Sequence, residues 1–358
     1  MRVCFLNDNF YRSSGITKVL ERLASSASFS DIELFCVGCE TVQGQRVENE
    51  EQTIVPADRY KTFLLMDRTK FIPELLRFAQ WLKATKCELV HVHHRRLATL
   101  CRLVAPLTGV RILFTGHLTF PDATWFRMLA PNDLTGVSPS VVQYLERATN
   151  ASHISLIYNP HLFPATAPVR APSAPKRVVS IGRLDSVKMH WVLIEAWEQL
   201  RIQGVTAVLD IIGEGPLRPE LTELIRSKGL TEQVRLLGFL DNLDQRLAEY
   251  DFNVLVSETE GFPNVVVEAA MHSIPSLVTD VAGSRDTLQP GLALPNGIPC
   301  GDVSALVDAL SIWLKSPQEL VDDGVRFFSF LRGLCERDLV SAQYKKLFED
   351  LLSNRQYA

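Results

Sequence analysis

Short apolar segments alternate with amphipathic helical segments along almost the whole chain, and this alternation limits the fold more than any other feature. Strand-like segments include "RVCFLN", "IELFCVG" and "VRILFTGH" in the first half, and "RVVSIG", "AVLDIIG" and "FNVLVS" in the second. A typical helical segment, "SSGITKVLERLASSA", has apolar residues at Ile16, Val19, Leu20 and Leu23. Strands that alternate with helices at this spacing predict βαβ units and parallel sheets, so the expected fold class is α/β.

The domain organisation follows from length and from one proline-rich segment. At 358 residues the chain exceeds one typical core, so two domains are expected. Residues 159–177 contain five prolines and show no periodicity, which is typical of a linker. We therefore predict a first domain at 1–160, a linker at 161–177 and a second domain at 178–338. The remaining residues, 339–358, include a helix whose apolar stripe must be buried.

Composition predicts a globular protein of the cytosol. Hydrophobic residues make up 46% of the chain and charged residues 22%, which sets aside disordered and collagen-like classes. The start, "MRVCFLNDNF", has only four consecutive apolar residues, too few for the core of a signal peptide. The seven cysteines show no disulfide or zinc spacing, so we expect free, mostly buried thiols.

Charge is divided unevenly between the two halves. The net charge of −4 argues against a nucleic-acid-binding protein. Residues 1–160 carry 18 Lys and Arg against 15 Asp and Glu, whereas residues 161–358 carry 19 against 26. The first domain is thus expected to meet something anionic, such as phosphates or a membrane surface.

Two motifs of the second half follow strands and suit a diphosphate. "SIGRLDSVK" brings Arg183 and Lys188 to a strand end beside a glycine; ordinary surface cations are the alternative reading. "LDIIGEGPLRPEL" has Gly213 and Gly215 after a strand, but Arg218 stands where a dinucleotide fingerprint needs its third glycine. A hydride-transferring enzyme is therefore disfavoured, and a glycine-rich turn near a nucleotide is retained.

The segment "SETEGFPNVVVEAAM" predicts a turn that enters a helix near Asn264, a residue suited to the N-cap. A helix N-terminus attracts phosphate, and Gly261 allows close backbone approach. Glu260 in the turn can accept hydrogen bonds from sugar hydroxyls, and Glu268 in the helix can bridge the diol of a ribose. The alternative is helix capping with a solvated face.

The first half adds a glycine and several histidines. Gly15 opens a helix after the first strand, as a second seat for an anion, and His117 ends the strand "VRILFTGH". A structural role is the alternative for this histidine. Metal binding by His91 and His93 of "HVHHRR" is disfavoured, because these residues share one face of a strand without a carboxylate partner on that face.

Together these residues resemble glycosyltransferase family 4, the retaining GT-B transferases that use nucleotide-diphosphate sugars. The resemblance covers nearly the whole chain and is strongest at E-x7-E, here Glu260 to Glu268. "GRLDSVK", "GEGPLRPEL", "LTGVSPSVVQYL", "VTDVAGSRD" and "PCGDVSALVDAL" match in type and order. It implies two doubly wound, Rossmann-like parallel-sheet domains facing each other across a cleft, with residues 339–358 crossing back to the first domain.

The resemblance also implies roles for individual residues. Arg183 and Lys188 would neutralise the diphosphate, Gly213 and Gly215 would lie by the nucleotide, and Glu268 would bind ribose. The donor sugar would be held by Glu260 with the backbone of Gly261 and Phe262, and catalysis would involve His117, Glu260, Arg183 and Lys188. Phosphate would meet the helix start at Asn264, Val265 and Val266, and Gly15 from the first domain. No cofactor and no divalent metal are expected.

The implied reaction is hexosyl transfer, with a UDP-sugar as the expected donor and GDP-mannose as the alternative. The acceptor would be a glycan or lipid-linked hydroxyl in surface polysaccharide synthesis, chosen by first-domain segments such as "HVHHRR" and 118–128. A peripheral membrane contact through the first domain is part of this expectation. A nucleotide-sugar epimerase or a non-catalytic partner of another transferase are the rival readings.

Three positions depart from the family pattern. Ser14 stands before Gly15 where the family often has two glycines, and Met189 and Ser273 occupy positions where it favours glycine. Because no charged group is lost, activity is still expected.

Overall fold

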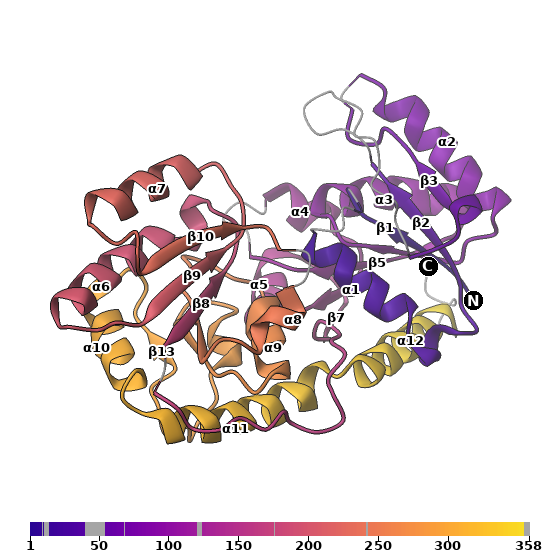
Figure 1. Cartoon of the computed structure of the whole chain (residues 1–358). Helices are drawn as coiled ribbons and strands as arrows, with labels where there is room; N and C mark the ends of the chain where they lie inside the picture. The colour runs from indigo at the N-terminus through magenta and orange to yellow at the C-terminus, as the bar shows by residue number, and fades with distance from the viewer. Residues whose placement is uncertain are drawn as a thin grey trace. The chain divides into compact units, whose positions relative to one another are not determined.

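The computed structural model describes residues 1–8, 10, 14–39, 54–67, 69–119, 124–174, 176–240 and 243–353. Parts of two predicted segments, residues 11–13 and 120–123, lie outside this range. The chain divides into two compact units, the first formed by Met1–Leu162 with Cys335–Ala358 and the second by Phe163–Leu334. Both units are α/β with parallel strands, as the alternation in the sequence predicts (Figure 1).

In its described residues the first unit contains a seven-stranded sheet in the order β3-β2-β1-β4-β5-β6-β7. Its strands are β1 (Arg2–Leu6), β2 (Glu33–Gly38), β3 (Tyr60–Thr62), β4 (Leu89–Val92), β5 (Arg111–Gly116), β6 (Asp133–Gly136) and β7 (His153–Leu156). The order reverses between β1 and β4, and ligands of such sheets bind beyond the carboxyl ends of the strands at this switch point.

The helices of the first unit are amphipathic and cover the sheet. They are α1 (Gly15–Ala24), α2 (Phe71–Ala84), α3 (Arg95–Thr108), α4 (Thr124–Leu129), α5 (Pro139–Ala148) and α12 (Arg337–Ser353), with 3-10 turns at Ala27–Phe29 and Ala57–Arg59. Helix α5 begins as predicted, because the hydroxyl of Ser138 accepts a hydrogen bond from the amide of Val141 at 3.3 Å.

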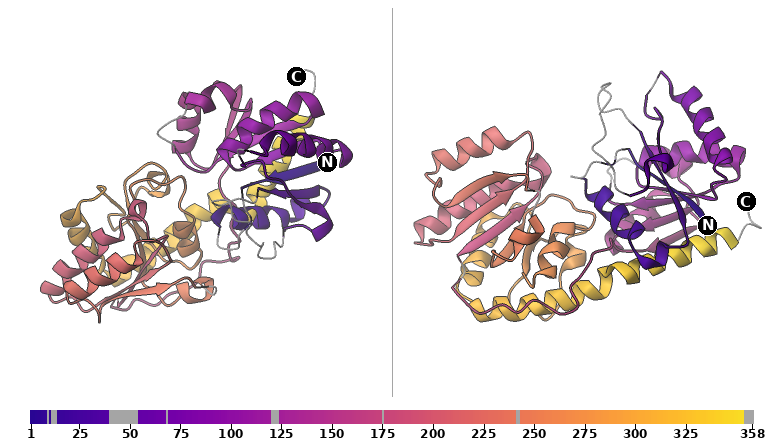
Figure 2. Two further views of the ribbon diagram at one scale, coloured as in Figure 1. Left: turned by 90° about the horizontal axis from the view of Figure 1, so that it is seen from above. Right: turned by 45° about the vertical axis from the view of Figure 1, so that its right-hand side comes forward.

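Helix α12 lies beside α1 on one face of the first sheet (Figures 1 and 2). Tyr344, Phe348 and Leu351 are buried in the same hydrophobic cluster as Phe5 of β1. On its outer side Lys345 pairs with Asp31 at 2.7 Å.

In its described residues the second unit contains a six-stranded sheet in the order β10-β9-β8-β11-β12-β13, which reverses between β8 and β11. The strands are β8 (Arg177–Ile181), β9 (Val208–Ile212), β10 (Val234–Gly238), β11 (Phe252–Leu255), β12 (Ser276–Thr279) and β13 (Gly297–Ile298). The helices are α6 (His190–Ile202), α7 (Arg218–Ser227), α8 (Leu243–Leu247), α9 (Asn264–Met271), α10 (Val303–Trp313) and α11 (Pro317–Cys335), with 3-10 turns η3 (Ser186–Lys188) and η4 (Arg285–Thr287).

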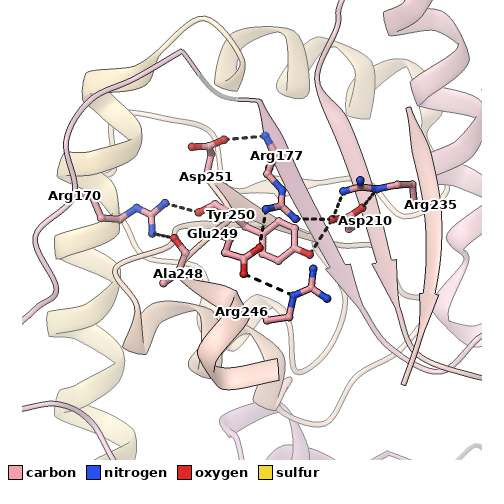
Figure 3. Close-up of polar contacts among 9 residues, drawn as sticks. All are labelled: Arg170, Arg177, Asp210, Arg235, Arg246, Ala248, Glu249, Tyr250 and Asp251. Carbon is pink, nitrogen blue, oxygen red and sulfur yellow. Dashed lines mark hydrogen bonds and ion pairs between the residues drawn. The ribbon is translucent and has the colours of Figure 1, made fainter. Parts of the chain in front are cut away.

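Asp210 of β9 is a buried carboxylate at the centre of a polar network in the second unit (Figure 3). It accepts hydrogen bonds from Arg235 at 2.6 and 2.8 Å, from the Tyr250 hydroxyl at 2.9 Å and from Arg177 at 3.2 Å. Burial by itself raises the pKa of Asp210, but these hydrogen bonds outweigh it and hold the pKa below its ordinary value. The network links β8, β9 and β10 to Tyr250, which lies just before β11.

The segment that enters the second unit is fastened to the same region. Arg170 donates hydrogen bonds to the carbonyl oxygens of Ala248 and Tyr250 (Figure 3). A cavity of about 310 Å³ lies beside Arg170 and Asp251. It is lined by residues other than those predicted to bind the nucleotide, so it is not the candidate site.

The cysteines are free thiols, and all except Cys300 are buried, as the sequence predicts. None of the helices in the described part of the chain is long and apolar enough to cross a membrane.

Candidate functional site

The loops that follow β8 and β11 carry most of the predicted donor-binding residues. These two strands are hydrogen-bonded neighbours at the switch point of the second sheet. Arg183 and Lys188 follow β8, and Glu260 follows β11, so the fold brings these segments to the same edge. This edge is where the topology of an open parallel sheet places a ligand.

Lys188 and Glu260 form an ion pair at the centre of this edge. The ammonium group of Lys188 donates a hydrogen bond to Oε1 of Glu260, and the hydroxyl of Ser257 donates to the same oxygen at 2.7 Å. Glu260 is only 6% exposed. Asp185 caps the turn η3 by accepting a hydrogen bond from the Lys188 amide at 3.2 Å, which positions the lysine. The carboxylate predicted to hold a sugar is therefore bound by the cation predicted to hold phosphate.

Arg183 is placed differently from Lys188. Its guanidinium pairs with Asp185 at 2.7 Å, and its side chain is 80% exposed. An exposed pair of this kind contributes little stability and is readily exchanged for another anion. The two cations predicted to bind the diphosphate therefore differ in environment: Arg183 is exposed to solvent, whereas Lys188 is bound by the buried carboxylate of Glu260.

Gly213 and Gly215 are required by the close packing of two loops. A Cβ atom on Gly213, whose φ is +144°, would lie 1.9 Å from the carbonyl oxygen of Gly182, and one on Gly215 would lie 2.4 Å from that of Leu184. The amide of Leu184 also donates to the carbonyl of Glu214 at 3.0 Å. These glycines hold the Arg183 loop in place, and a direct contact with a nucleotide stays a prediction.

The start of α9 corrects one prediction. Asn264 is the first helical residue, and Pro263 occupies the N-cap position without a side-chain hydrogen bond. The amide of Val266 donates to the Pro263 carbonyl at 3.0 Å and the Val266 side chain is fully buried. Its predicted contact with phosphate would require that bond to break, which leaves the amide of Val265, a half-buried residue, as the better placed of the two.

The turn before α9 is pressed against the loop after β12. The amide of Glu260 donates to the Ala282 carbonyl at 3.3 Å. A Cβ atom on Gly283 would lie 2.4 Å from the Glu260 carbonyl oxygen and 2.5 Å from that of Gly261. Phe262 is buried as well. The backbone that was predicted to face the donor sugar is thus fixed from behind, whereas Glu268 on α9 stays partly exposed.

The first unit places His117 directly after β5 and Gly15 at the first position of α1. Nε2 of His117 lies 2.9 Å from Nδ1 of His93, which follows the neighbouring strand β4. Burial lowers the pKa of His117 to about 4, so the ring is neutral at physiological pH. His91 lies beside this pair, with Nε2 at 2.7 Å from the Thr115 hydroxyl.

Among the described residues, no three His, Cys, Asp or Glu side chains come together in a way that could hold a metal ion. His91 and His93 contact each other with ring centroids 4.2 Å apart, and one nitrogen of each ring makes a polar contact within the first unit, with Thr115 and His117 respectively.

Two departures from the family pattern coincide with strained backbone. Met189 has φ of +42° and Ser273 has φ of +55°, in the left-handed region that favours glycine. The chain therefore keeps the backbone conformation for which a glycine is suited while carrying a side chain there. Met189 follows Lys188 directly, so this strained residue lies within the candidate site.

Ser257, Asp185 and His93 have roles at these sites that the sequence reasoning missed. Ser257 lies three residues before Glu260, and Asp185 three before Lys188, so a search for local hydrogen-bond partners at that spacing would find them. His93 could be found only from strand pairing, because it is 24 residues from His117 in the sequence and reaches it only where β4 pairs with β5.

Comparisons with known proteins agree on the family. Residues 13–161 match the family described as "Glycosyltransferase Family 4", and residues 175–316 match "Glycosyl transferases group 1". An N-acetylgalactosaminyltransferase of Campylobacter jejuni that acts on a diphospho-undecaprenol acceptor is 39% identical over 112 residues, which are 31% of this chain and 30% of that protein. N-acetyl-alpha-D-glucosaminyl L-malate synthase of Bacillus anthracis is 26% identical over 179 residues, 49% of this chain and 46% of that protein.

The matched segments span between about a third and a half of the length of these curated relatives. The likeness of fold extends further. The crystal structure of Anabaena HepE in complex with UDP and glucose superimposes with a TM-score of 0.81, covers 98% of this chain and 100% of that one, and shares 16% of its residues. The architecture is GT-B, with two parallel-sheet α/β domains. The chain belongs to glycosyltransferase family 4.

Proposed function

We propose that this protein is a retaining glycosyltransferase that moves a hexose from a UDP-sugar to a hydroxyl of a glycan or lipid-linked acceptor in surface polysaccharide synthesis. The observation that carries the proposal is the grouping of Arg183, Lys188 and Glu260 at the switch point of the second sheet. A UDP donor is supported by the UDP in the HepE structure. A lipid-linked acceptor is supported by the name of the Campylobacter relative.

The cations of the second unit are assigned to the leaving diphosphate. Transfer breaks the bond between the anomeric carbon and the phosphate oxygen, so negative charge grows on the diphosphate. Fixed cations stabilise this charge without a divalent metal. Lys188 would exchange or share its Glu260 partner when the diphosphate arrives, and Arg183 would leave its exposed contact with Asp185.

Retention of configuration is assigned to a front-face reaction. The acceptor hydroxyl would form the new bond on the face from which the diphosphate departs, and its proton would pass to the released phosphate oxygen. The candidate residues of the first unit offer His117 for contact with the transferred sugar and no carboxylate placed as a nucleophile. A covalent glycosyl-enzyme intermediate is for that reason disfavoured.

Mass spectrometry of a donor-by-acceptor screen tests this proposal. Panels of UDP- and GDP-sugars are incubated with glycan and lipid-linked acceptors, and the anomeric configuration of any product is determined by NMR. An acceptor increased by one hexose with the donor's configuration supports the proposal. An inverted product would refute the retaining mechanism, and conversion of a UDP-sugar without any acceptor would favour an epimerase.

A membrane contact of the first unit is proposed from its exposed side chains. Large aliphatic residues are exposed on three helices of this unit, namely Ile72, Leu76, Leu103, Leu107 and Met128. The same three helices carry exposed cations, namely Arg77, Lys83, Arg102 and Arg127. Mixed aliphatic and basic surfaces suit an anionic lipid leaflet.

Vesicle sedimentation tests the membrane contact. The wild-type protein should sediment with phosphatidylglycerol vesicles more than with phosphatidylcholine vesicles, and Leu103→Glu with Leu107→Glu should abolish the difference. Ile202→Glu in the second unit is the matched control, since Ile202 is 75% exposed and lies outside this surface. Equal sedimentation of the double variant and the wild type would contradict the proposal.

A further inference from the structure

The contact between His93 and His117 defines how the His117 ring is held. Both residues follow adjacent parallel strands, β4 and β5, whose register pairs Val92 with Phe114. The continuation of the two strands brings the imidazoles together, with Nδ1 of His93 at 2.9 Å from Nε2 of His117. His93 is buried, whereas His117 stays partly exposed.

Only one proton can lie in this contact when both rings are neutral. Burial, together with the neighbouring His91 and His117, lowers the pKa of His93 well below its usual value, and burial lowers that of His117 to about 4. A neutral imidazole carries its proton on one nitrogen and a lone pair on the other. Either His93 donates from Nδ1, or His117 donates from Nε2.

The environment of His93 decides between these alternatives. Its second nitrogen, Nε2, is buried and has no hydrogen-bond partner among the described residues. If His117 donated, His93 would carry its proton on Nε2 as a buried N–H group without an acceptor. Buried N–H groups without partners are rarer in proteins than acceptors whose lone pairs are left over. Donation by His93 leaves only a lone pair in that position.

We infer that His93 is a positioning residue that donates from Nδ1 to Nε2 of His117 and holds His117 as its Nδ1–H tautomer. Nδ1 of His117 then carries the proton and has no partner in the described part of the chain. The ring offers a hydrogen-bond donor there, not a base. Resting on the proposed function, this predicts that His117 donates to an oxygen of the transferred sugar and does not deprotonate the acceptor.

Histidine NMR tests the tautomer without any assay of activity. The full chain labelled with ¹⁵N-histidine is studied at pH 7.5 by long-range proton–nitrogen correlation, and the signals are assigned with His93 and His117 variants. We expect a protonated Nδ1 and a non-protonated Nε2 for His117. A protonated Nε2, or signals averaged between both tautomers, would overturn the inference.

Two substitutions separate positioning from folding. His93→Leu removes the donor, so the His117 signals should shift toward averaging, and kcat of transfer should fall about tenfold to a hundredfold with little change in KM for the donor. His93→Asn keeps an amide N–H near the position of Nδ1 and should restore the tautomer and much of the rate. A thermal melt shows whether each variant is folded. If His93→Leu is folded and leaves the His117 tautomer unchanged, the inference is wrong.

Failure of this inference can be distinguished from failure of the proposed function. UDP binding, measured by isothermal titration calorimetry, reports on the second unit. Absence of UDP binding together with an Nδ1–H tautomer would refute the proposed function and leave this inference intact. UDP binding together with an Nε2–H tautomer would refute this inference and leave the proposed function intact.

Discussion

Glu260→Gln should tighten the binding of UDP. The buried Glu260 carboxylate accepts a hydrogen bond from the ammonium group of Lys188. A diphosphate that binds this ammonium group must share it with the carboxylate, and the two anions repel each other. Glutamine has nearly the same shape, can still accept the Ser257 hydrogen bond and carries no charge.

The size of the effect follows from the geometry of a shared cation. Two oxygens that each lie about 2.8 Å from one nitrogen are at most about 6 Å apart. At this separation and an effective dielectric constant of about 20, two unit charges repel by about 3 kcal/mol. The Lys188 side chain is 20% exposed, so solvent screens part of this energy. A gain of about 1–2 kcal/mol corresponds to a Kd for UDP that is about 5- to 30-fold lower.

Isothermal titration calorimetry at constant ionic strength measures this change. Asp185→Asn is the matched control, because it frees Arg183 from an ion pair on a side chain that is 80% exposed, and its effect on the Kd should stay within about threefold. Glu260→Gln should increase the affinity for a UDP-sugar less than the affinity for UDP, because Glu260 is predicted to bind the sugar. Unchanged or weaker UDP binding by Glu260→Gln would refute the reasoning.

Three further substitutions probe separate parts of the chain. His117→Ala should lower kcat of transfer by about 10²- to 10³-fold with UDP binding unchanged in calorimetry, and wild-type turnover would make this histidine structural. Asp210→Asn should lower the free energy of unfolding by about 2–3 kcal/mol in urea titrations, because Arg177 and Arg235 lose a buried partner. The lowered pKa of Asp210 means that its contribution is complete above about pH 4 and is lost as pH falls, so the variant should lose less stability on acidification. Ser273→Gly should raise the melting temperature by about 2–4 °C, because glycine relieves a φ of +55° and removes a buried hydroxyl without a partner in the described residues; a lower melting temperature would contradict the account of the strain.

The fold could be predicted because its signal is local. Apolar segments such as "RVCFLN" and "FNVLVS" are buried on both faces and read as strands regardless of their neighbours. The helix stripe at Tyr344 and Phe348 also predicts burial by itself. The two-residue strand β13 could not be found in this way, because it is too short to show a periodicity.

The candidate site was less predictable because its contacts join distant segments. The motifs predicted a role for Lys188 and a different role for Glu260. Their ion pair could not be predicted, because it depends on the adjacency of β8 and β11, which are about 70 residues apart in the chain. The same holds for His93 and His117. Residue preferences for the N-cap predicted Asn264 at that position, but Pro263 occupies it and Asn264 is the first residue of the helix.

The most direct test of the central claim is the titration of the wild-type protein with UDP and with GDP. The account predicts that UDP binds, that GDP binds more weakly, and that Arg183→Ala combined with Lys188→Ala weakens UDP binding by at least about tenfold, because two cations of the clamp are lost. No binding of either nucleotide at millimolar concentration, or binding that the double variant leaves unchanged, would contradict the claim that this edge of the second sheet holds the donor diphosphate.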